Sequence, residues 1–153
     1  MTDLLYYEDM EPSETFVEHD ITHTVTKEEI ISFAKQYDPI PFHLNEDDAA
    51  KWGHHTVTAP GTLTEAICVS LIHKNRTPIA AFGLLAKELT LPRPLFAGET
   101  VVLYSRMNSK RVSRNKPDRG VMEMCFQLKT TDGALVYDAK HIVIIKRREG
   151  QAS

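Results

Sequence analysis

Residues 60–75 have the sequence PGTLTEAICVSLIHKN. Apolar side chains occur on every side of the helix that this segment predicts, and a helix that is apolar all round is typical of a protein core. Pro60 and Gly61 suit a helix start, and Pro78 requires the helix to stop by Asn75. We therefore expect a long buried central helix from Gly61 to about Asn75.

On the C-terminal side of this helix the apolar period changes from helical to two, which is typical of strands. The turn pair Asp132-Gly133 between two alternating runs predicts a hairpin. The strands expected from composition and alternation cover residues 15–25, 82–91, 100–112, 122–129 and 135–145. The predicted fold class is α+β: one domain over residues 1–153, with an antiparallel sheet of about five strands wrapped around the long central helix. Residues 1–14 are expected to form an N-terminal segment and residues 148–153 a flexible tail.

Two shorter helices are expected before the central one. Thr26 starts a capping box with Glu29, and Asp38 should end that helix because it precedes Pro39. Asn45 can cap a second helix, for which Gly53 supplies a left-handed stop.

Composition and charge are those of an ordinary globular protein. The 153 residues are 42% hydrophobic and 25% charged, with a net charge of −3. The first twenty residues hold acids but no Lys or Arg, and no apolar run approaches the roughly 20 residues of a membrane span. Cys68 and Cys125 lie in apolar runs without a metal-binding spacing, so we expect buried free thiols, a cytoplasmic location and no membrane partner.

The segment most suggestive of chemistry is YDPIPFH at residues 37–43. Asp38 and His43 form a candidate acid/base pair, and the two prolines between them stiffen the backbone that holds both. A pair that converges on one water molecule can take up and return a proton. Asp-Pro turns and isolated loop histidines are also common structural features, so either residue alone would say little.

Gly61 is the third candidate. Pro60 has no N–H, Gly61 allows a ligand to approach the backbone, and the first amides of a helix point outward with a positive dipole. Such donors stabilise negative charge that develops on a substrate oxygen. Ordinary helix capping explains Pro-Gly equally well.

Other clusters predict less. His43, His54 and His55 lack the ligand spacing of a metal site, and we expect no metal. Phe42 and Trp52 could line a substrate tunnel or simply pack in the core. Six bases within fourteen residues could attract phosphate groups or form a solvated strand end: Arg106, Lys110, Arg111, Arg114, Lys116 and Arg119. No recognition helix accompanies them, so nucleic acid is not an expected partner.

The spacing of the candidates resembles that of a known family. Pro41, His43 and Gly61 follow Asp38 by 3, 5 and 23 positions, as in the MaoC-like dehydratases, the (R)-specific enoyl-CoA hydratase group of the hotdog superfamily. Further similar segments lie at residues 7–9, 91–94, 97–100 and 113–120. The resemblance therefore covers nearly the whole chain.

This resemblance implies a hotdog fold, a homodimer or higher homo-oligomer, and reversible addition of water to a trans-2-enoyl thioester. Asp38 and His43 would hold and activate the water, while the Gly61 amide would polarise the thioester carbonyl. No cofactor is implied, because coenzyme A is part of the acyl-CoA-type substrate. The acid and base roles remain undivided between Asp38 and His43.

Two positions depart from the family pattern. Ile40 replaces an Asn that usually steadies the catalytic loop, and Pro60 replaces the His or Ser that commonly precedes the helix glycine. These departures keep two alternatives open: a hotdog acyl-CoA thioesterase, and a non-catalytic acyl-CoA-binding or partner subunit.

Overall fold

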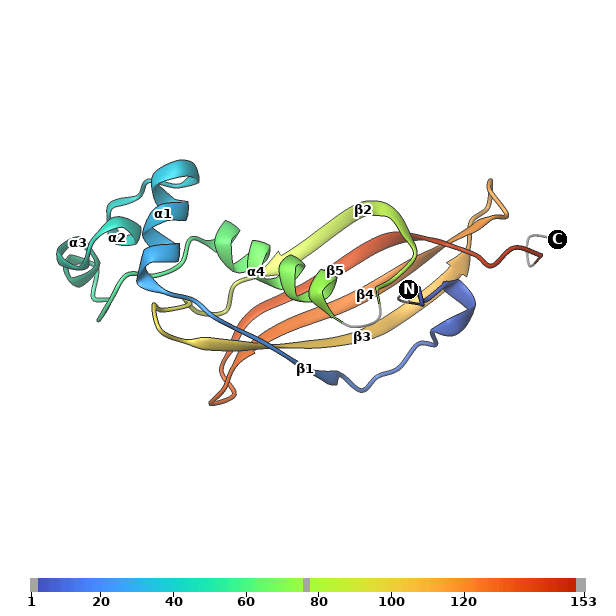
Figure 1. Cartoon of the computed structure of the whole chain (residues 1–153), viewed down its shortest axis with the longest axis horizontal. Coiled ribbons are helices and arrows are strands. Elements are labelled where there is room, and N and C mark those ends of the chain that lie inside the picture. The colour runs from blue at the N-terminus through green and yellow to red at the C-terminus, as the bar shows by residue number, and fades with distance from the viewer. Residues whose placement is uncertain (1–2, 76–77, 151–153) are drawn as a thin grey trace.

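The computed structural model describes residues 3–75 and 78–150. A short 3-10 helix (η1), three short α-helices and a longer one precede most of the strands (Figure 1). In chain order the elements are η1 (Tyr7–Asp9), β1 (Val17–Thr24), α1 (Lys27–Tyr37), α2 (Pro41–Leu44), α3 (Glu46–Lys51), α4 (Gly61–Lys74), β2 (Ala81–Thr90), β3 (Thr100–Val112), β4 (Arg119–Thr130) and β5 (Leu135–Lys146).

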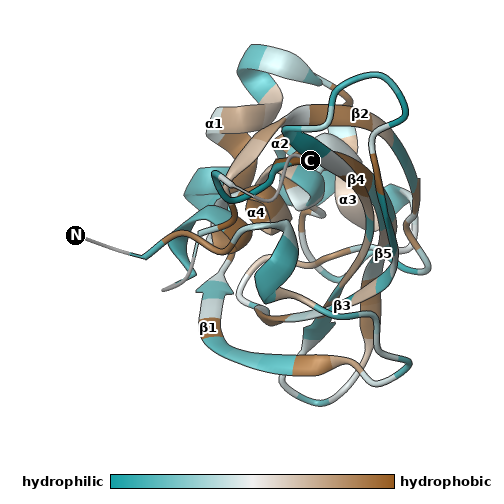
Figure 2. Cartoon of the chain, turned by 90° about the vertical axis from the view of Figure 1, so that its right-hand side faces the viewer, coloured by the Kyte–Doolittle hydropathy of each residue, from teal (hydrophilic) through white to brown (hydrophobic). Residues whose placement is uncertain are grey.

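The strands form one five-stranded sheet in the order β1-β3-β4-β5-β2, with antiparallel neighbours throughout. The sheet curls around α4, which lies in its hollow (Figure 2). The predicted α+β class and the predicted strands are confirmed. Gly133, with φ 92°, makes the expected hairpin turn between β4 and β5.

The core lies between the hollow of the sheet and α4. On β4 the alternating residues Met122, Met124, Phe126 and Leu128 are all buried, as their period of two predicts. Opposite them, α4 buries Leu63, Thr64, Ile67, Cys68 and Leu71. Because inward-facing side chains of a strand recur at every second position, the register of the sheet is fixed by this apolar face.

The central helix is covered on one side only, which differs from the expectation of full burial. Thr62, Ala66 and His73 lie along an exposed stripe of α4. The edge strand β2 is exposed along almost its whole length, and Leu84 and Leu85 keep 53% and 62% of their surface accessible. The physical reason is that one sheet can wrap only one side of a helix.

Helices α1, α2 and α3 gather at one end of the elongated molecule (Figure 1). The Thr26 hydroxyl accepts from the Glu29 amide at 3.1 Å, and Asn45 caps α3 by accepting from the Asp48 amide at 2.8 Å. Gly53, with φ 82°, follows α3 as predicted. The helix α2 was not predicted, since residues 41–44 were expected to be a stiff loop; Pro41 occupies its first turn, where proline is favoured.

The opposite end is held by charge pairs between the N-terminal segment and the sheet. Glu8 pairs with Arg147, Asp9 with Arg148, and Glu11 with Lys110. The expected flexible tail at residues 148–153 is only partly described: Arg148 is bound to Asp9, and residues 151–153 lie outside the described residues. Across residues 3–75 and 78–150, no helix is long and apolar enough to cross a membrane.

Candidate functional site

Asp38 and His43 are brought together at the end that carries the short helices. Asp38 follows the last residue of α1, and His43 lies in α2. Their side chains approach to 3.9 Å between Oδ2 and Nε2, with the His43 side chain 8% exposed and that of Asp38 32% exposed. This separation is longer than a direct hydrogen bond, so one small oxygen can contact both atoms.

The imidazole of His43 is fixed from its other side. Nδ1 lies 2.6 Å from the Thr58 carbonyl oxygen and 3.2 Å from the Thr58 hydroxyl. A carbonyl can only accept, so Nδ1 carries the hydrogen and donates it. In the neutral ring Nε2 is therefore the acceptor, and it is the atom that faces Asp38.

The backbone holds the loop at Ile40. The Asp38 amide donates to Ala34 O at 2.9 Å, the Ile40 amide to Asp38 O at 2.8 Å, and the His43 amide to Ile40 O at 2.9 Å. Ile40 is 40% exposed, and its side chain makes no capping hydrogen bond at the start of α2. The loop between Asp38 and His43 is thus held by a run of backbone bonds and not by a bond from the Ile40 side chain.

Gly61 begins α4 without a capping side chain, because Pro60 supplies none. In the described part of the chain the Gly61 amide has no acceptor, as expected for the first turn of a helix. A methyl group added at Gly61 would lie 2.6 Å from Leu91 Cδ1. The backbone is therefore open to a ligand but closely bordered by one side chain.

The link between the pair and the helix start is short. Thr58, which accepts from His43, precedes Gly61 by three residues. With consecutive Cα atoms about 3.8 Å apart, the Cα atoms of Thr58 and Gly61 lie within about 11 Å of each other. The three predicted site residues therefore belong to one region of the fold.

Phe42 links His43 to the neighbouring aromatic side chains. Phe42 contacts His43 edge-on with ring centroids 4.5 Å apart and Trp52 at 5.9 Å, and Trp52 is 69% exposed. His54 and His55 pack against Phe96. Within residues 3–75 and 78–150, no three His, Cys, Asp or Glu side chains are grouped to hold a metal.

Both cysteines are buried free thiols, as predicted. Burial raises the pKa of Cys68 to about 12 and also raises that of Cys125. Because a thiolate rather than a thiol is the nucleophile, neither cysteine is suited to covalent catalysis at neutral pH.

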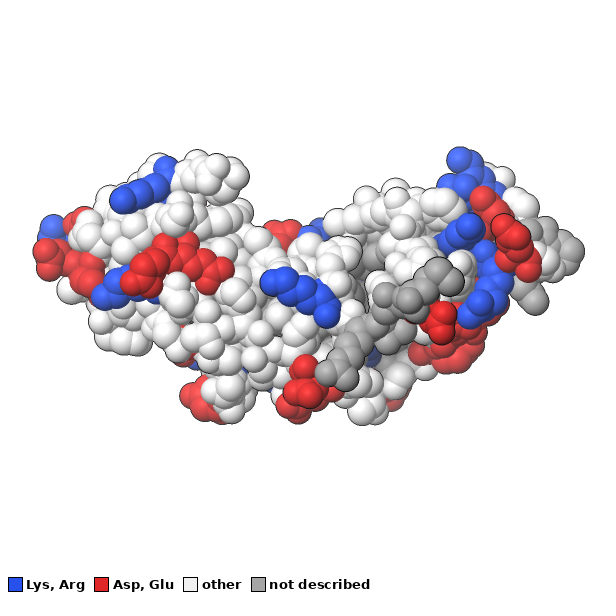
Figure 3. Space-filling view, in the orientation of Figure 1, with Lys and Arg blue, Asp and Glu red and all other residues white. Residues whose placement is uncertain are grey.

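The six clustered bases lie around the β3–β4 turn and along β3, far from α1–α3 (Figures 1 and 3). Lys110 donates to the Tyr7 and Met10 carbonyls and to Glu11, while Arg119 pairs with Asp118. Arg106 binds Ser13 O and Asn108. Two of these bases, Lys110 and Arg106, thus hold the N-terminal segment.

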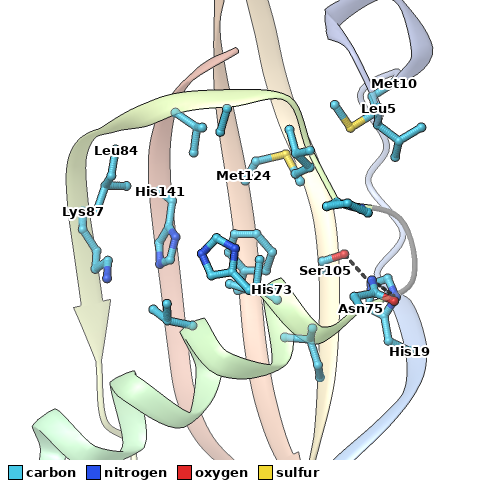
Figure 4. Close-up of a pocket in the computed structure, with 18 of the residues that line it drawn as sticks. Leu5, Met10, His19, His73, Asn75, Leu84, Lys87, Ser105, Met124 and His141 are labelled. Carbon is cyan, nitrogen blue, oxygen red and sulfur yellow. Dashed lines mark hydrogen bonds between the residues drawn. The ribbon is translucent and has the colours of Figure 1, made fainter. Parts of the chain in front are cut away.

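An apolar pocket beside the second half of α4 was not found from the sequence. Its volume is about 420 Å³, within the range of small-molecule sites (Figure 4). Its walls come from α4, β2, the concave face of the sheet and the N-terminal segment, and include Val69, Ile72, Leu84, Leu103, Met124 and Leu5. Since these residues span almost the whole chain, no local pattern signals them.

Comparison with known protein families shows to which family this chain belongs. The model of the MaoC-like domain matches residues 10–123, a span that includes Asp38, His43 and Gly61. The chain belongs to the MaoC-like dehydratase family. This MaoC-like dehydratase domain has no match among curated proteins.

Solved structures give the same fold. A MaoC-like dehydratase from Rhodospirillum rubrum is 27% identical, with a TM-score of 0.85, covering 94% of this chain and 98% of its own. An R-hydratase from Pseudomonas aeruginosa is 22% identical, with a TM-score of 0.73 and coverage of 94% and 86%. A Mycobacterium tuberculosis protein described as having a double hotdog fold is 14% identical, with a TM-score of 0.79 and coverage of 96% and 46%. The predicted hotdog fold is confirmed.

Proposed function

We propose that this MaoC-like dehydratase adds water reversibly to a trans-2-enoyl thioester, with coenzyme A as the thiol. The observation that carries the proposal is the 3.9 Å gap between Asp38 Oδ2 and His43 Nε2. Both atoms accept hydrogen bonds when Asp38 is ionised and His43 is neutral, so together they suit the two hydrogens of one water molecule.

In the hydration direction the water oxygen forms a bond to C3 of the substrate while one water proton passes to the Asp38/His43 pair. The electrons of the C2–C3 double bond move toward the thioester carbonyl and give an enolate. The pair then returns its proton to C2, so that it ends in its starting state. Dehydration is the same sequence reversed.

The enolate oxygen needs a donor, and the start of α4 supports one. The Gly61 amide is uncapped and points out of a helix N-terminus, where the dipole favours negative charge. A preorganised donor of this kind is worth about 3 kcal/mol in transition-state stabilisation.

The apolar pocket suits the acyl chain. Helical rise of about 1.5 Å per residue puts Val69 about 12 Å and Ile72 about 16 Å along α4 from Gly61. A thioester carbonyl at Gly61 would therefore leave its chain directed along the helix toward this pocket.

A homodimer fits the exposed surfaces. The apolar edge strand β2 and the exposed stripe of α4 would both be covered by a second copy, which removes an edge that otherwise invites aggregation. The tuberculosis protein with a double hotdog fold, of which this chain matches 46%, supports pairing of two such units. Light scattering should give twice the monomer mass, and Leu85→Glu should lower it.

The direct test is turnover of crotonyl-CoA and longer trans-2-enoyl-CoAs, followed by the loss of absorbance of the conjugated thioester. Asp38→Asn and His43→Ala should each abolish most activity. Asp47→Asn, on the exposed face of α3, is the matched control and should leave the rate unchanged.

The outcomes separate the alternatives. Hydration that survives both site substitutions contradicts the proposed pair. Release of free thiol from saturated acyl-CoA without hydration of enoyl-CoA identifies a thioesterase. Binding of acyl-CoA without any turnover identifies a non-catalytic binding or partner subunit.

A further inference from the structure

The pocket beside α4 combines an apolar body with several uncharged polar groups. Its accessible lining is mostly apolar, yet His19, His73, His141 and Ser105 also face it (Figure 4). They come from β1, α4, β5 and β3, so the sheet and the helix both contribute. A plain alkyl chain would pack against the apolar part and offer these polar groups no hydrogen bond.

His141 is the most buried of them, at 6% exposure. Burial, together with the nearby charge of Lys87, lowers its pKa to about 4, so the ring is neutral at pH 7 and offers one donor and one acceptor. Among the described residues its one hydrogen-bond contact is the Tyr137 hydroxyl, at the long distance of 3.5 Å. A buried polar group so weakly satisfied gains from a further partner.

Ser105 offers a second unused donor. The side-chain nitrogen Nδ2 of Asn75 lies 3.1 Å from His19 Nδ1, and His19 Nε2 lies 2.6 Å from Ser105 Oγ (Figure 4). Since an amide NH₂ only donates, Nδ1 accepts, and Nε2 must carry the hydrogen that Ser105 accepts. The Ser105 hydroxyl proton is then available to the pocket, because no acceptor for it occurs in the described chain.

The pocket offers no net charge for an anion. Lys87 lies in its wall but is paired with Glu65 of α4. His141 is uncharged at neutral pH. A carboxylate would lose its hydration here without gaining an opposite charge, which is costly.

We propose that the pocket accommodates an acyl tail that carries a neutral oxygen, such as a hydroxyl or ketone, which hydrogen-bonds either to His141 or, on the other side of the pocket, to Ser105 (Figure 4). This inference rests on the proposed function, since it takes the occupant to be the acyl part of the thioester. Along α4, Glu65 and His73 lie about 6 and 18 Å from Gly61. The oxygen is therefore carried well beyond the reacting C2 and C3 atoms.

The test compares trans-2-dodecenoyl-CoA, whose chain is long enough to reach the pocket from Gly61, with its 12-hydroxy, 11-oxo and 12-carboxy forms. The hydroxy and oxo tails should raise kcat/KM about tenfold over the plain chain, the gain of one good hydrogen bond in a dry site, and the carboxylate should lower it. If Ser105 is the partner of the oxygen, Ser105→Ala should reduce this preference severalfold. Ser109→Ala, the same change on the exposed part of β3, should keep it.

His141 is tested together with its partner. The single change His141→Phe would leave the Tyr137 hydroxyl buried alone and could cost folding, so Tyr137→Phe/His141→Phe removes both groups. If His141 is the partner of the oxygen, this double variant should reduce the preference for an oxygenated tail to within about twofold of unity. Retention of the full preference in both the double variant and Ser105→Ala would overturn the proposal.

Titration calorimetry with saturated dodecanoyl-CoA and 12-hydroxydodecanoyl-CoA separates this proposal from the hydratase assignment. Tighter binding of the hydroxylated thioester without any enoyl-CoA turnover supports the tail pocket and contradicts the hydratase. Turnover of all chains with no preference, or a preference for the plain chain, supports the hydratase and contradicts the tail pocket.

Discussion

The two halves of α4 are built in different ways. At its start, Gly61 lies close in sequence to the groups it would work with, Asp38, His43 and Thr58, and backbone hydrogen bonds fix most of the geometry. The second half of α4 borders a pocket whose walls come from residues as distant in the sequence as Leu5 and Val143. The candidate site is thus positioned locally, while the pocket depends on the assembled sheet; on the proposed function, catalysis and chain selection can vary independently.

The largest effect is expected at the start of α4. Asp38→Asn and His43→Ala should each lower kcat/KM for an enoyl-CoA by about 10² to 10⁴, the usual contribution of a placed proton transfer. Because both act on one water, the double variant should fall no further than the worse single variant. Losses that multiply would show that the two side chains act independently, and steady-state kinetics measures this.

The features that could be predicted from the sequence are those set by residues close together in the chain. Thr26 and Asn45 act as caps within three residues, and Asp132-Gly133 acts within a turn, so local rules found them. The helix α2 is a single turn, too short for a periodic pattern, although Pro41 is a start signal.

The pocket could not be predicted, because His19 meets Ser105 across 86 residues and only strand pairing brings them together. The same is true of the pairs that hold the N-terminal segment, such as Glu8 with Arg147. The exposed side of α4 was also missed, since an all-apolar helix does not reveal whether its own sheet or a second chain covers it.

The next effect concerns the pocket wall. The fold holds the pKa of His141 at about 4 against an ordinary 6.5, so the unfolded chain takes up the proton first as the pH falls. The free energy of unfolding should therefore drop between pH 6.5 and 4, by up to about 3 kcal/mol. Chemical denaturation at a series of pH values measures it.

His141→Gln should flatten this pH dependence, whereas His73→Gln, at an exposed position of the same pocket, should leave it unchanged. An unaltered slope in His141→Gln would mean that another group is responsible.

A smaller effect is expected for Gly61→Ala, which returns to the start of α4. The added methyl meets only the end of the Leu91 side chain, at 2.6 Å, so the fold should tolerate it. It would nevertheless obstruct a carbonyl approaching the amide, and kcat/KM should fall about tenfold to a hundredfold. If Gly61→Ala/Leu91→Ala restores the rate, displacement of Leu91 is the cause; if it does not, the obstruction lies at the amide.

The smallest effect is expected where the N-terminal segment closes the far end of the pocket. Burial opposes ionisation of Glu8, but hydrogen bonds from the Arg148 amide and the Arg147 side chain outweigh it and lower its pKa below 4.5. Glu8→Gln should therefore reduce the free energy of unfolding by about 1 kcal/mol at pH 7. This difference should shrink as the pH falls through and below 4.5, because protonation removes the same interaction from the unsubstituted protein.

Glu11→Gln is the matched control: its carboxylate is 77% exposed, so its pair with Lys110 should be worth at most about 0.5 kcal/mol. Equal losses for the two variants would mean that burial does not strengthen the Glu8 contacts.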